Sequence, residues 1–263
     1  MTTQPRPGIV AAGFHDAECA GYQADLSLWL ALAETTGGPV YDIGSGTGRV
    51  SLPLATAGFE VVAIDLEADL LAELERRAAA QGVTVRTAAA DMRTLGAQLP
   101  ADLPPAALVL IPMQSLQLVG GSVERHATFK EARALAAPGA EMAVAIVGAV
   151  EPFDARDAYP SLLPPDIAYL DGFRFDSTPL AVLQDGPEDQ IDMHRKRVVR
   201  DEQGAILGTP EDVVITLQPV TVPQVQAEAV AAGWSIGEVI GMAPTDEHAG
   251  GTVVTFVLED DDA

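Results

Sequence analysis

The sequence predicts an α/β protein with a doubly wound, mostly parallel seven-stranded sheet and an inserted antiparallel β lid. Short apolar runs alternate with helical patterns from residue 40 to 147, which is typical of parallel strands joined by crossover helices. Prolines then cluster between residues 151 and 220, and the helical period disappears there. Because a helix, strand, strand pattern follows, we expect the chain to return to the same sheet after the insertion.

The expected elements follow in chain order. An amphipathic helix at 17–34 comes first and is ended by Gly37-Gly38-Pro39. Strands of the main sheet are expected at 40–43, 60–64, 83–88, 107–111, 141–147, 234–240 and 252–258. Helices are expected between them at 49–57, 68–81, 123–137 and 223–232, the last capped by Thr221. The insertion is expected to hold antiparallel strands at 195–200, 205–207 and 212–218.

These elements suggest four parts. Residues 1–39 are expected to form an N-terminal helical cap and 40–150 a cofactor-binding core, while 151–220 form a lid or substrate subdomain. Residues 221–263 are expected to supply the closing helix and strands of the core. We treat the insertion as a lid on one domain.

Composition restricts the partners. The chain has 263 residues, 48% of them hydrophobic, and a formal charge of -23, which predicts a soluble globular protein that repels nucleic acid and anionic membranes. The basic run at 194–197 is expected to be one polar face of a hairpin. The single cysteine, Cys19, excludes an internal disulfide, and we expect no metal site. The start lacks an apolar run of signal-peptide type, so we expect a cytoplasmic protein.

The most informative motif is the segment VYDIGSGTGR at 40–49, an apolar strand that runs into three alternate glycines and then a helix. Glycines allow a sharp turn and a close approach to a ligand, and the helix presents free N–H groups. The spacing is Gly-x-Gly-x-Gly, whereas a dinucleotide fingerprint needs glycine at Arg49 or Ser51. The lysine of a nucleotide-hydrolase phosphate loop is also missing.

Acidic residues end the next two strands. Asp65 follows Val61 to Ile64, and a carboxylate at this edge can accept both hydroxyls of a ribose. Asp91 follows the third strand and is well placed for the exocyclic amine of adenine. A single acid after a strand is usually a helix cap, so the prediction of one nucleoside site depends on the order and the shared edge of all three strand ends.

This arrangement resembles the small-molecule branch of the class I S-adenosylmethionine-dependent methyltransferases, which have a Rossmann-like fold. The resemblance covers residues 40 to 147 well. It implies that S-adenosylmethionine is the cofactor, with the glycines around its methionine part, Asp42 near its amino group, Asp65 on the ribose, and Asp91 with Met92 at the adenine. The full set implied to bind it is Tyr22, Asp42, Gly44, Ser45, Gly46, Gly48, Asp65, Leu66, Asp91, Met92, Ile111 and Met113.

The substrate side is less legible. Residues 108–117 resemble the family's fourth strand end but hold neither the Asn-Pro-Pro-Tyr signature of amino-methylating nucleic-acid enzymes nor a cysteine. Gln114 and Gln117 could hydrogen-bond a substrate, or could be buried groups with backbone partners. Tyr159 and Arg174 could contact an organic substrate, although an aromatic cluster of this kind can equally be the lid's own core.

Methyl transfer from a sulfonium is an in-line displacement that depends mainly on alignment in a dry pocket. His15 and His194 are the candidate bases, with a surface position as the alternative for each. We therefore expect an enzyme that methylates N or O of a small-molecule acceptor, as a monomer or homodimer. A methyltransferase-fold enzyme that uses the cofactor without methylation, as in cyclisation, and a non-catalytic binding protein are the alternatives.

Overall fold

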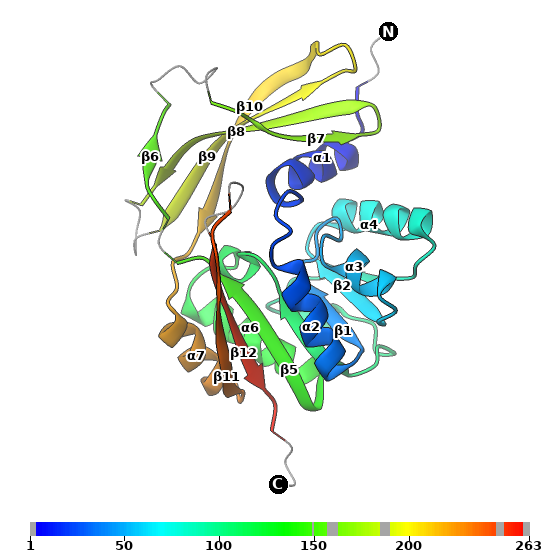
Figure 1. Cartoon of the computed structure of the whole chain (residues 1–263), viewed down its shortest axis with the longest axis vertical. Coiled ribbons are helices and arrows are strands. Elements are labelled where there is room, and N and C mark those ends of the chain that lie inside the picture. The colour runs from blue at the N-terminus through cyan, green and yellow to red at the C-terminus, as the bar shows by residue number, and fades with distance from the viewer. Residues whose placement is uncertain (1–3, 149, 157–162, 185–189, 246–249, 260–263) are drawn as a thin grey trace. The chain divides into compact units, whose positions relative to one another are not determined.

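The computed structural model describes residues 4–148, 150–156, 163–184, 190–245 and 250–259. By its contacts the chain divides into two compact units. One unit joins residues 1–22 to 149–219, and we call it the insert unit; the other, the core unit, comprises 23–148 and 220–263. Figure 1 shows the elements of each unit in chain colours. Among the described residues, no helix is both long enough and apolar enough to cross a membrane.

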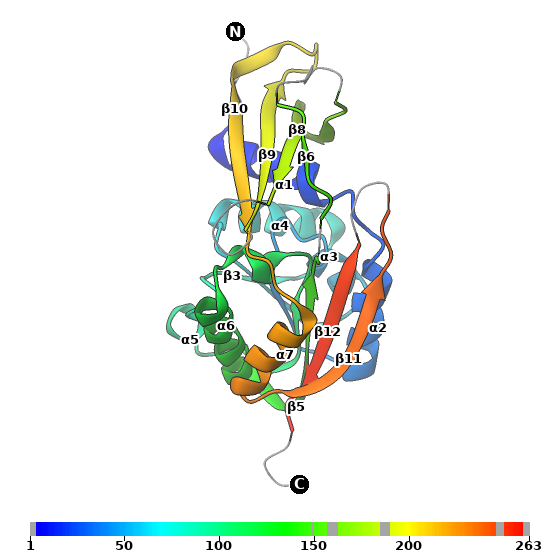
Figure 2. The same ribbon diagram turned by 90° about the vertical axis from the view of Figure 1, so that its left-hand side faces the viewer.

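The described residues of the core unit form one seven-stranded sheet in the order β11-β12-β5-β4-β1-β2-β3, and Figure 2 shows β11 and β12 side by side at one edge. Strands β1 to β5 run parallel, and β12 is antiparallel to both of its neighbours. The strand bounds are β1 Val40–Ile43, β2 Val61–Asp65, β3 Arg86–Ala89, β4 Ala106–Ile111, β5 Ala136–Ile146, β11 Ser235–Met242 and β12 Gly251–Val257. The predicted doubly wound, mostly parallel sheet is therefore confirmed. Its order reverses between β1 and β4, where such sheets open a crevice.

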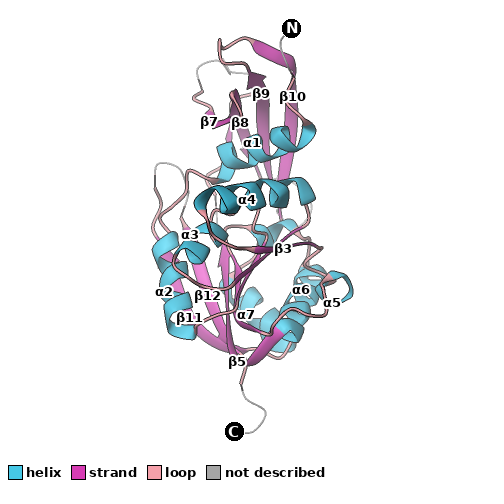
Figure 3. Cartoon of the chain, turned by 90° about the vertical axis from the view of Figure 1, so that its right-hand side faces the viewer, coloured by secondary structure: helices cyan, strands magenta, loops and turns pink. Residues whose placement is uncertain are grey.

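Helices cover both faces of this sheet. The first face carries α2 Leu26–Thr36, α3 Ser51–Thr56 and α4 Ala68–Gln81. The second carries α5 Leu95–Gln98, α6 Ser122–Leu135 and α7 Val222–Ala231, while the short 3-10 helix η1 Ser115–Leu118 follows β4. Figure 3 shows the helices and strands in contrasting colours. Alternation explains the two layers, because Leu108 and Leu110 of β4 pack in the first core cluster whereas Val109 and Ile111 pack in the second.

Local sequence sets the ends of these helices. Gly82 follows α4 in the left-handed conformation, with φ of 70°, as expected for a residue that ends a helix. Thr221 and Gln224 form a capping box at the start of α7, so the predicted cap is confirmed.

The insert unit contains an antiparallel sheet in the order β10-β9-β8-β6, with β7 also paired to β8, within the residues described. The bounds are β6 Phe153–Asp154, β7 Asp166–Leu170, β8 Phe173–Leu183, β9 Ile191–Arg200 and β10 Ile206–Leu217. Helix α1, Pro7–Cys19, packs against β7 and β8 of this sheet. Helix α1 approaches β8 very closely at Gly13: a Cβ on this residue would lie 2.4 Å from the Phe175 ring.

Charge also fixes α1 to the inserted sheet. Glu18, at the end of α1, accepts hydrogen bonds from Ser177 of β8 at 2.7 Å and from Arg197 of β9 at 2.7 and 2.8 Å. The Arg197 guanidinium also lies 5.2 Å from the centre of the Phe14 ring, and Phe14 meets Phe175 edge to face at 5.3 Å. Arg195 of the same basic run also lies 3.6 Å from Glu18, so two arginines of the run at 194–197 pair with this helix.

Two expectations about the elements were wrong. The single helix expected at 17–34 is two helices, α1 and α2, separated by a turn at residues 20–25 that contains Gly21. Because the division between the units falls after Tyr22, α1 belongs to the insert unit and α2 to the core unit. The hairpin of β7 and β8 was not expected at all, although β9 and β10 were.

Candidate functional site

The glycine loop leaves β1 at the carboxyl edge of the sheet. The backbone N–H groups of Gly44 and Ser45 both donate to the carbonyl of Ile64 in β2, at 2.8 and 3.0 Å. Gly44, Gly46 and Gly48 have φ of 77°, 55° and 94°, in the left-handed region that residues other than glycine rarely adopt. The alternate spacing in the sequence therefore reflects three successive left-handed positions.

Two of these glycines leave room for different neighbours. A Cβ on Gly44 would lie 2.6 Å from Oγ of Ser115 and 3.8 Å from Cε of Met92, so this glycine admits the loop after β4. A Cβ on Gly48 would lie 2.8 Å from Leu74 of α4. Gly48 thus serves the packing of α4 on the loop, whereas Gly44 lies beside two strand ends.

Replacement of Gly44 by alanine should destabilise the fold by the cost of its positive φ and by about 1–3 kcal/mol more from the collision with Ser115. Gly82→Ala is a matched control, because its φ is 70° and no described atom lies within 4 Å of the added Cβ. In a Ser115→Gly background the cost of Gly44→Ala should fall to that of Gly82→Ala. Urea denaturation of the four variants measures these differences, and equal costs for Gly44→Ala and Gly82→Ala would contradict the close approach.

Asp65 ends β2 beside this loop, because β1 and β2 are parallel neighbours with Ile43 opposite Ile64. Its Oδ2 accepts a hydrogen bond from the Gly46 N–H at 2.8 Å, and its Oδ1 accepts one from the Glu67 N–H at 2.9 Å. The expected convergence of the glycine loop and this acid is therefore present. The next residue, Leu66, is 64% exposed and leaves an apolar side chain at the same edge.

Asp42 lies beneath the loop and is only 1% exposed. Its Oδ2 accepts a hydrogen bond from the Ser51 hydroxyl at 2.5 Å. The pKa of Asp42 is raised to about 6, mainly by burial and to a smaller extent by the charge of Asp65, whereas the hydrogen bonds from Ser51 and the charge of Arg49 lower it. Oδ1 of Asp42 and Oγ of Ser45 are buried without a hydrogen-bond partner among the described residues, and we call them the open oxygens.

A buried ion pair adjoins the loop. Arg49 donates to both carboxylate oxygens of Asp25 at 2.5 and 2.9 Å, and the two side chains are 8% and 3% exposed. Sequence reasoning missed this pair. The sequence feature that could have indicated it is Arg49 just before a helix, where the helix dipole disfavours positive charge and a nearby carboxylate is needed. Asp25 stands at the N-cap of α2 without capping it, because its carboxylate binds Arg49.

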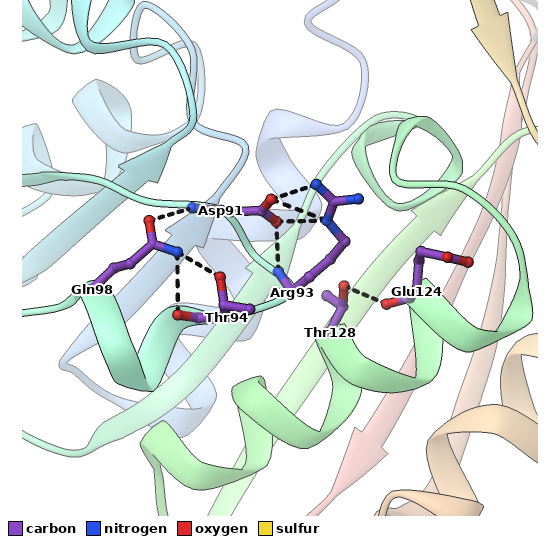
Figure 4. A network of polar contacts seen from close by, with 6 residues as sticks. All are labelled: Asp91, Arg93, Thr94, Gln98, Glu124 and Thr128. Atoms are coloured by element: carbon purple, nitrogen blue, oxygen red, sulfur yellow. Dashed lines mark hydrogen bonds and ion pairs between the residues drawn. The ribbon is translucent and has the colours of Figure 1, made fainter.

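Asp91 follows β3, and its carboxylate is paired with a neighbour in sequence (Figure 4). It accepts from the Arg93 backbone N–H at 2.9 Å and from Nε of the same residue at 2.9 and 3.0 Å. These bonds hold the pKa of Asp91 below its usual range. Asp91 does not cap a helix, since Thr94 is the N-cap of α5, and its carboxylate instead closes a local turn; Met92 is the residue of this strand end that comes near Gly44.

The segment after β4 contains a residue at positive φ, Met113, and a buried side-chain amide, Gln117. Met113 has a φ of 53°, which is unusual for a residue with a side chain. Gln117 is fully buried; its amide donates to the Val147 carbonyl and accepts from the Val147 N–H. Of the two hypotheses for Gln117, the structure favours backbone pairing. Gln114 lies at the start of η1, and the Ile111 side chain is buried in the core.

The remaining candidates belong to the insert unit. His15 lies on α1 and His194 on β9, both half-buried, and Tyr22 is buried. Arg174 of β8 is held by Asp176 at 2.5 Å, which compensates its charge. Tyr159 lies outside the described residues.

Comparison with known proteins agrees with this geometry. Residues 40–139 match the family model of the methyltransferase domain. No curated protein matches the chain in sequence. The fold is similar to that of the CcbJ methyltransferase from Streptomyces caelestis, with 21% identity, a TM-score of 0.63, and coverage of 90% of this chain and 96% of that one.

Two further structures are similar over nearly the whole chain. CalS10, an amino pentose methyltransferase from Micromonospora echinaspora, is 20% identical with a TM-score of 0.65 and covers 97% of this chain and 98% of its own. The sugar N-methyltransferase KedS8 from a Streptoalloteichus species is 14% identical with a TM-score of 0.66 and covers 99% and 98%.

The domain match spans the strands that carry the glycine loop, Asp65 and Asp91, and the sheet has the strand order of this fold. These findings define a methyltransferase domain. Residues 40–139 belong to the methyltransferase domain family, and these findings support an S-adenosylmethionine-dependent enzyme, as the resemblance of the sequence implied.

Proposed function

We propose that this enzyme methylates an amine nitrogen of a small organic molecule, with an amino sugar as the expected class of acceptor. The observation that carries the cofactor part is the convergence of the Gly46 N–H and the Asp65 carboxylate at one sheet edge. The two sugar or amino pentose methyltransferases support the acceptor, because their similarity extends over the inserted sheet as well as the core. The charge of -23 also favours attraction of a cationic amine over an anionic acceptor.

The residues present fit the cofactor. The open oxygens of Asp42 and Ser45 are buried acceptors suited to an ammonium group. Asp65 would accept the ribose hydroxyls, and Leu66 and Met92 would offer apolar contact to the adenine. When bound, S-adenosylmethionine supplies a methyl group on a sulfonium as the electrophile.

The chain's own contribution is alignment and proton removal. Gly44 and the Met113 turn shape the edge of the sheet at which an acceptor must be held in line. An amine reacts only after it has lost its proton, and His15 and His194 are the proposed acceptors of that proton. Both belong to the insert unit, from which we also propose Arg174 and Tyr159 as acceptor contacts. Gln114 is the proposed acceptor contact from the core unit.

The test of the function is turnover. Purified protein is incubated with S-adenosylmethionine and with pairs of acceptors. Each pair consists of an amino sugar and the matching sugar that carries a hydroxyl in place of the amine. We expect S-adenosylhomocysteine and an acceptor heavier by one methylene with the amino sugars only. Methylation of the hydroxyl members alone would replace N-methylation by O-methylation, and binding without turnover of any pair would contradict the proposed acceptor class.

Asp65→Ala tests the cofactor site. Loss of charge-assisted hydrogen bonds should weaken binding of S-adenosylmethionine by about 1–3 kcal/mol, or about 5- to 150-fold in Kd. Asp102→Ala is the control, because it removes the same charge from a side chain that is 76% exposed. Calorimetric titration measures both constants. An equal Kd for Asp65→Ala and Asp102→Ala would remove the ribose assignment.

A further inference from the structure

Asp42 is a buried acid with an incomplete set of partners among the residues that the structure describes. One oxygen accepts the Ser51 hydroxyl, but Oδ1 is one of the open oxygens, and Oγ of Ser45 is the other. A buried polar atom without a partner costs about 1–3 kcal/mol, and more when it carries charge. Two such atoms three residues apart at the same strand end indicate a polar group that the described part of the chain does not supply.

The charges that face Asp42 come from three elements. Arg49, beside α3, lowers its pKa, but the guanidinium of Arg49 is bound bidentately by Asp25 of the segment before α2. Asp65 of β2 raises the pKa of Asp42, while Ser51 of α3 lowers it through its hydroxyl and its backbone N–H. The one guanidinium that acts on Asp42 is therefore already paired with another carboxylate. Burial, with a smaller contribution from the charge of Asp65, explains why the pKa of Asp42 is raised to about 6.

We propose that binding of the cofactor expels a proton from Asp42, because the cofactor's ammonium group takes the place of that proton beside the open oxygens. This inference rests on the proposed cofactor site and deepens it. The step is balanced: the protein with protonated Asp42 binds the cationic ammonium, the O–H bond of the carboxyl breaks, and the proton passes to the solvent.

Linkage gives the size of the effect. With the pKa of free Asp42 at about 6, about 0.9 protons should be released per bound molecule at pH 5, about 0.5 at pH 6 and about 0.1 at pH 7. Affinity should fall up to about tenfold per pH unit below pH 6 and level off toward pH 7. The ligand's own amine is partly deprotonated near pH 8, so its binding as an ammonium group would take up a proton there. Release of protons therefore points to Asp42, and uptake points to the ligand.

The experiment is calorimetric titration of the full-length protein with S-adenosylhomocysteine at pH 5, 6 and 7. At each pH, two buffers with different ionisation enthalpies are used, because the dependence of the observed heat on the buffer gives the number of protons released. Asp102→Asn is the matched control, since it removes an exposed carboxylate outside the site. We expect this variant to release as many protons as the unchanged protein.

Two variants within the site distinguish the source of the proton. Asp42→Asn should bind without proton release and with an affinity that no longer depends on pH. Ser51→Ala removes the hydrogen bond that lowers the pKa of Asp42, so it should release more protons at pH 7 than the unchanged protein. The change in proton release caused by Ser51→Ala identifies Asp42 as the source of the proton even if Asp42→Asn binds too weakly to titrate.

The outcomes separate this inference from the proposed function. Absence of binding at all three pH values would overturn the cofactor site itself. Binding without proton release at pH 5 and 6 would leave that site in place and overturn the coupling. Release that persists in Asp42→Asn, or that Ser51→Ala leaves unchanged, would assign the proton to another group.

Discussion

Asp25→Ala is expected to lower the free energy of unfolding by about 3–5 kcal/mol. The change removes the two hydrogen bonds that Asp25 accepts from the guanidinium of Arg49, which is 8% exposed and cannot regain its hydration without a rearrangement of the loop. A buried pair is costly to break from one side only. The double variant Asp25→Ala/Arg49→Met should therefore lose much less stability than the single one. Urea denaturation at pH 7 measures both.

A surface pair serves as the control for this prediction. Arg86 and Asp102 lie 2.9 Å apart but are 39% and 76% exposed, so Asp102→Ala should cost less than about 1 kcal/mol. Equal losses for Asp25→Ala and for the double variant would show that the charge left on Arg49 is tolerated, which contradicts the argument. Because Arg49 follows Gly48 directly, the single variant should also weaken cofactor binding.

The core sheet could be predicted because its strands are short apolar runs with clear ends. Gly44 and Asp65 stand where β1 and β2 end, and parallel strands bring such ends to one edge whatever packs around them. The sequence thus sufficed to place the glycine loop beside this acid. Alternate glycines at positive φ were equally legible, since few other residues tolerate that conformation.

Partners of the site residues were not predictable in the same way. Ser115 reaches Gly44 and Asp25 reaches Arg49 from segments far apart in sequence, and no local pattern marks either contact. Ser51 was considered only as a position that lacked glycine, whereas in the structure its hydroxyl binds Asp42. Such contacts depend on how helices dock, which hydrophobic period alone does not specify.

The inserted sheet was underestimated because of one residue. Pro179 lies within β8, and a proline inside an apolar run argues against a strand, since it cannot donate a ladder hydrogen bond. In the structure the pairing of β8 with β9 shifts register between Pro179 and Ala181, so a bulge accommodates the proline. The turn before β8 uses Asp171 and Gly172, both at positive φ. A bulged strand of this kind has no regular alternation to detect.

Asp42→Asn is expected to stabilise the free protein at neutral pH while it weakens cofactor binding. The pKa of Asp42 is raised from 3.8 to about 6 by burial, so the folded state holds this proton more tightly than the unfolded state. The stability that the protonated carboxyl provides is complete below about pH 4, is lost as pH rises through about 6, and stays lost above that. Asparagine does not ionise and can still accept from Ser51, so the variant avoids this loss.

The stability advantage of Asp42→Asn should therefore grow from pH 4 to pH 6 and reach at most about 3 kcal/mol at pH 7.5. Urea denaturation of the two proteins at pH 4.5, 6 and 7.5 measures it, with Asp102→Asn as the exposed control. Parallel pH profiles of the variant and the unchanged protein would contradict the buried, ionisable carboxyl. A growing difference would mean that the site retains an acid that destabilises the free protein, because the bound cofactor compensates its charge.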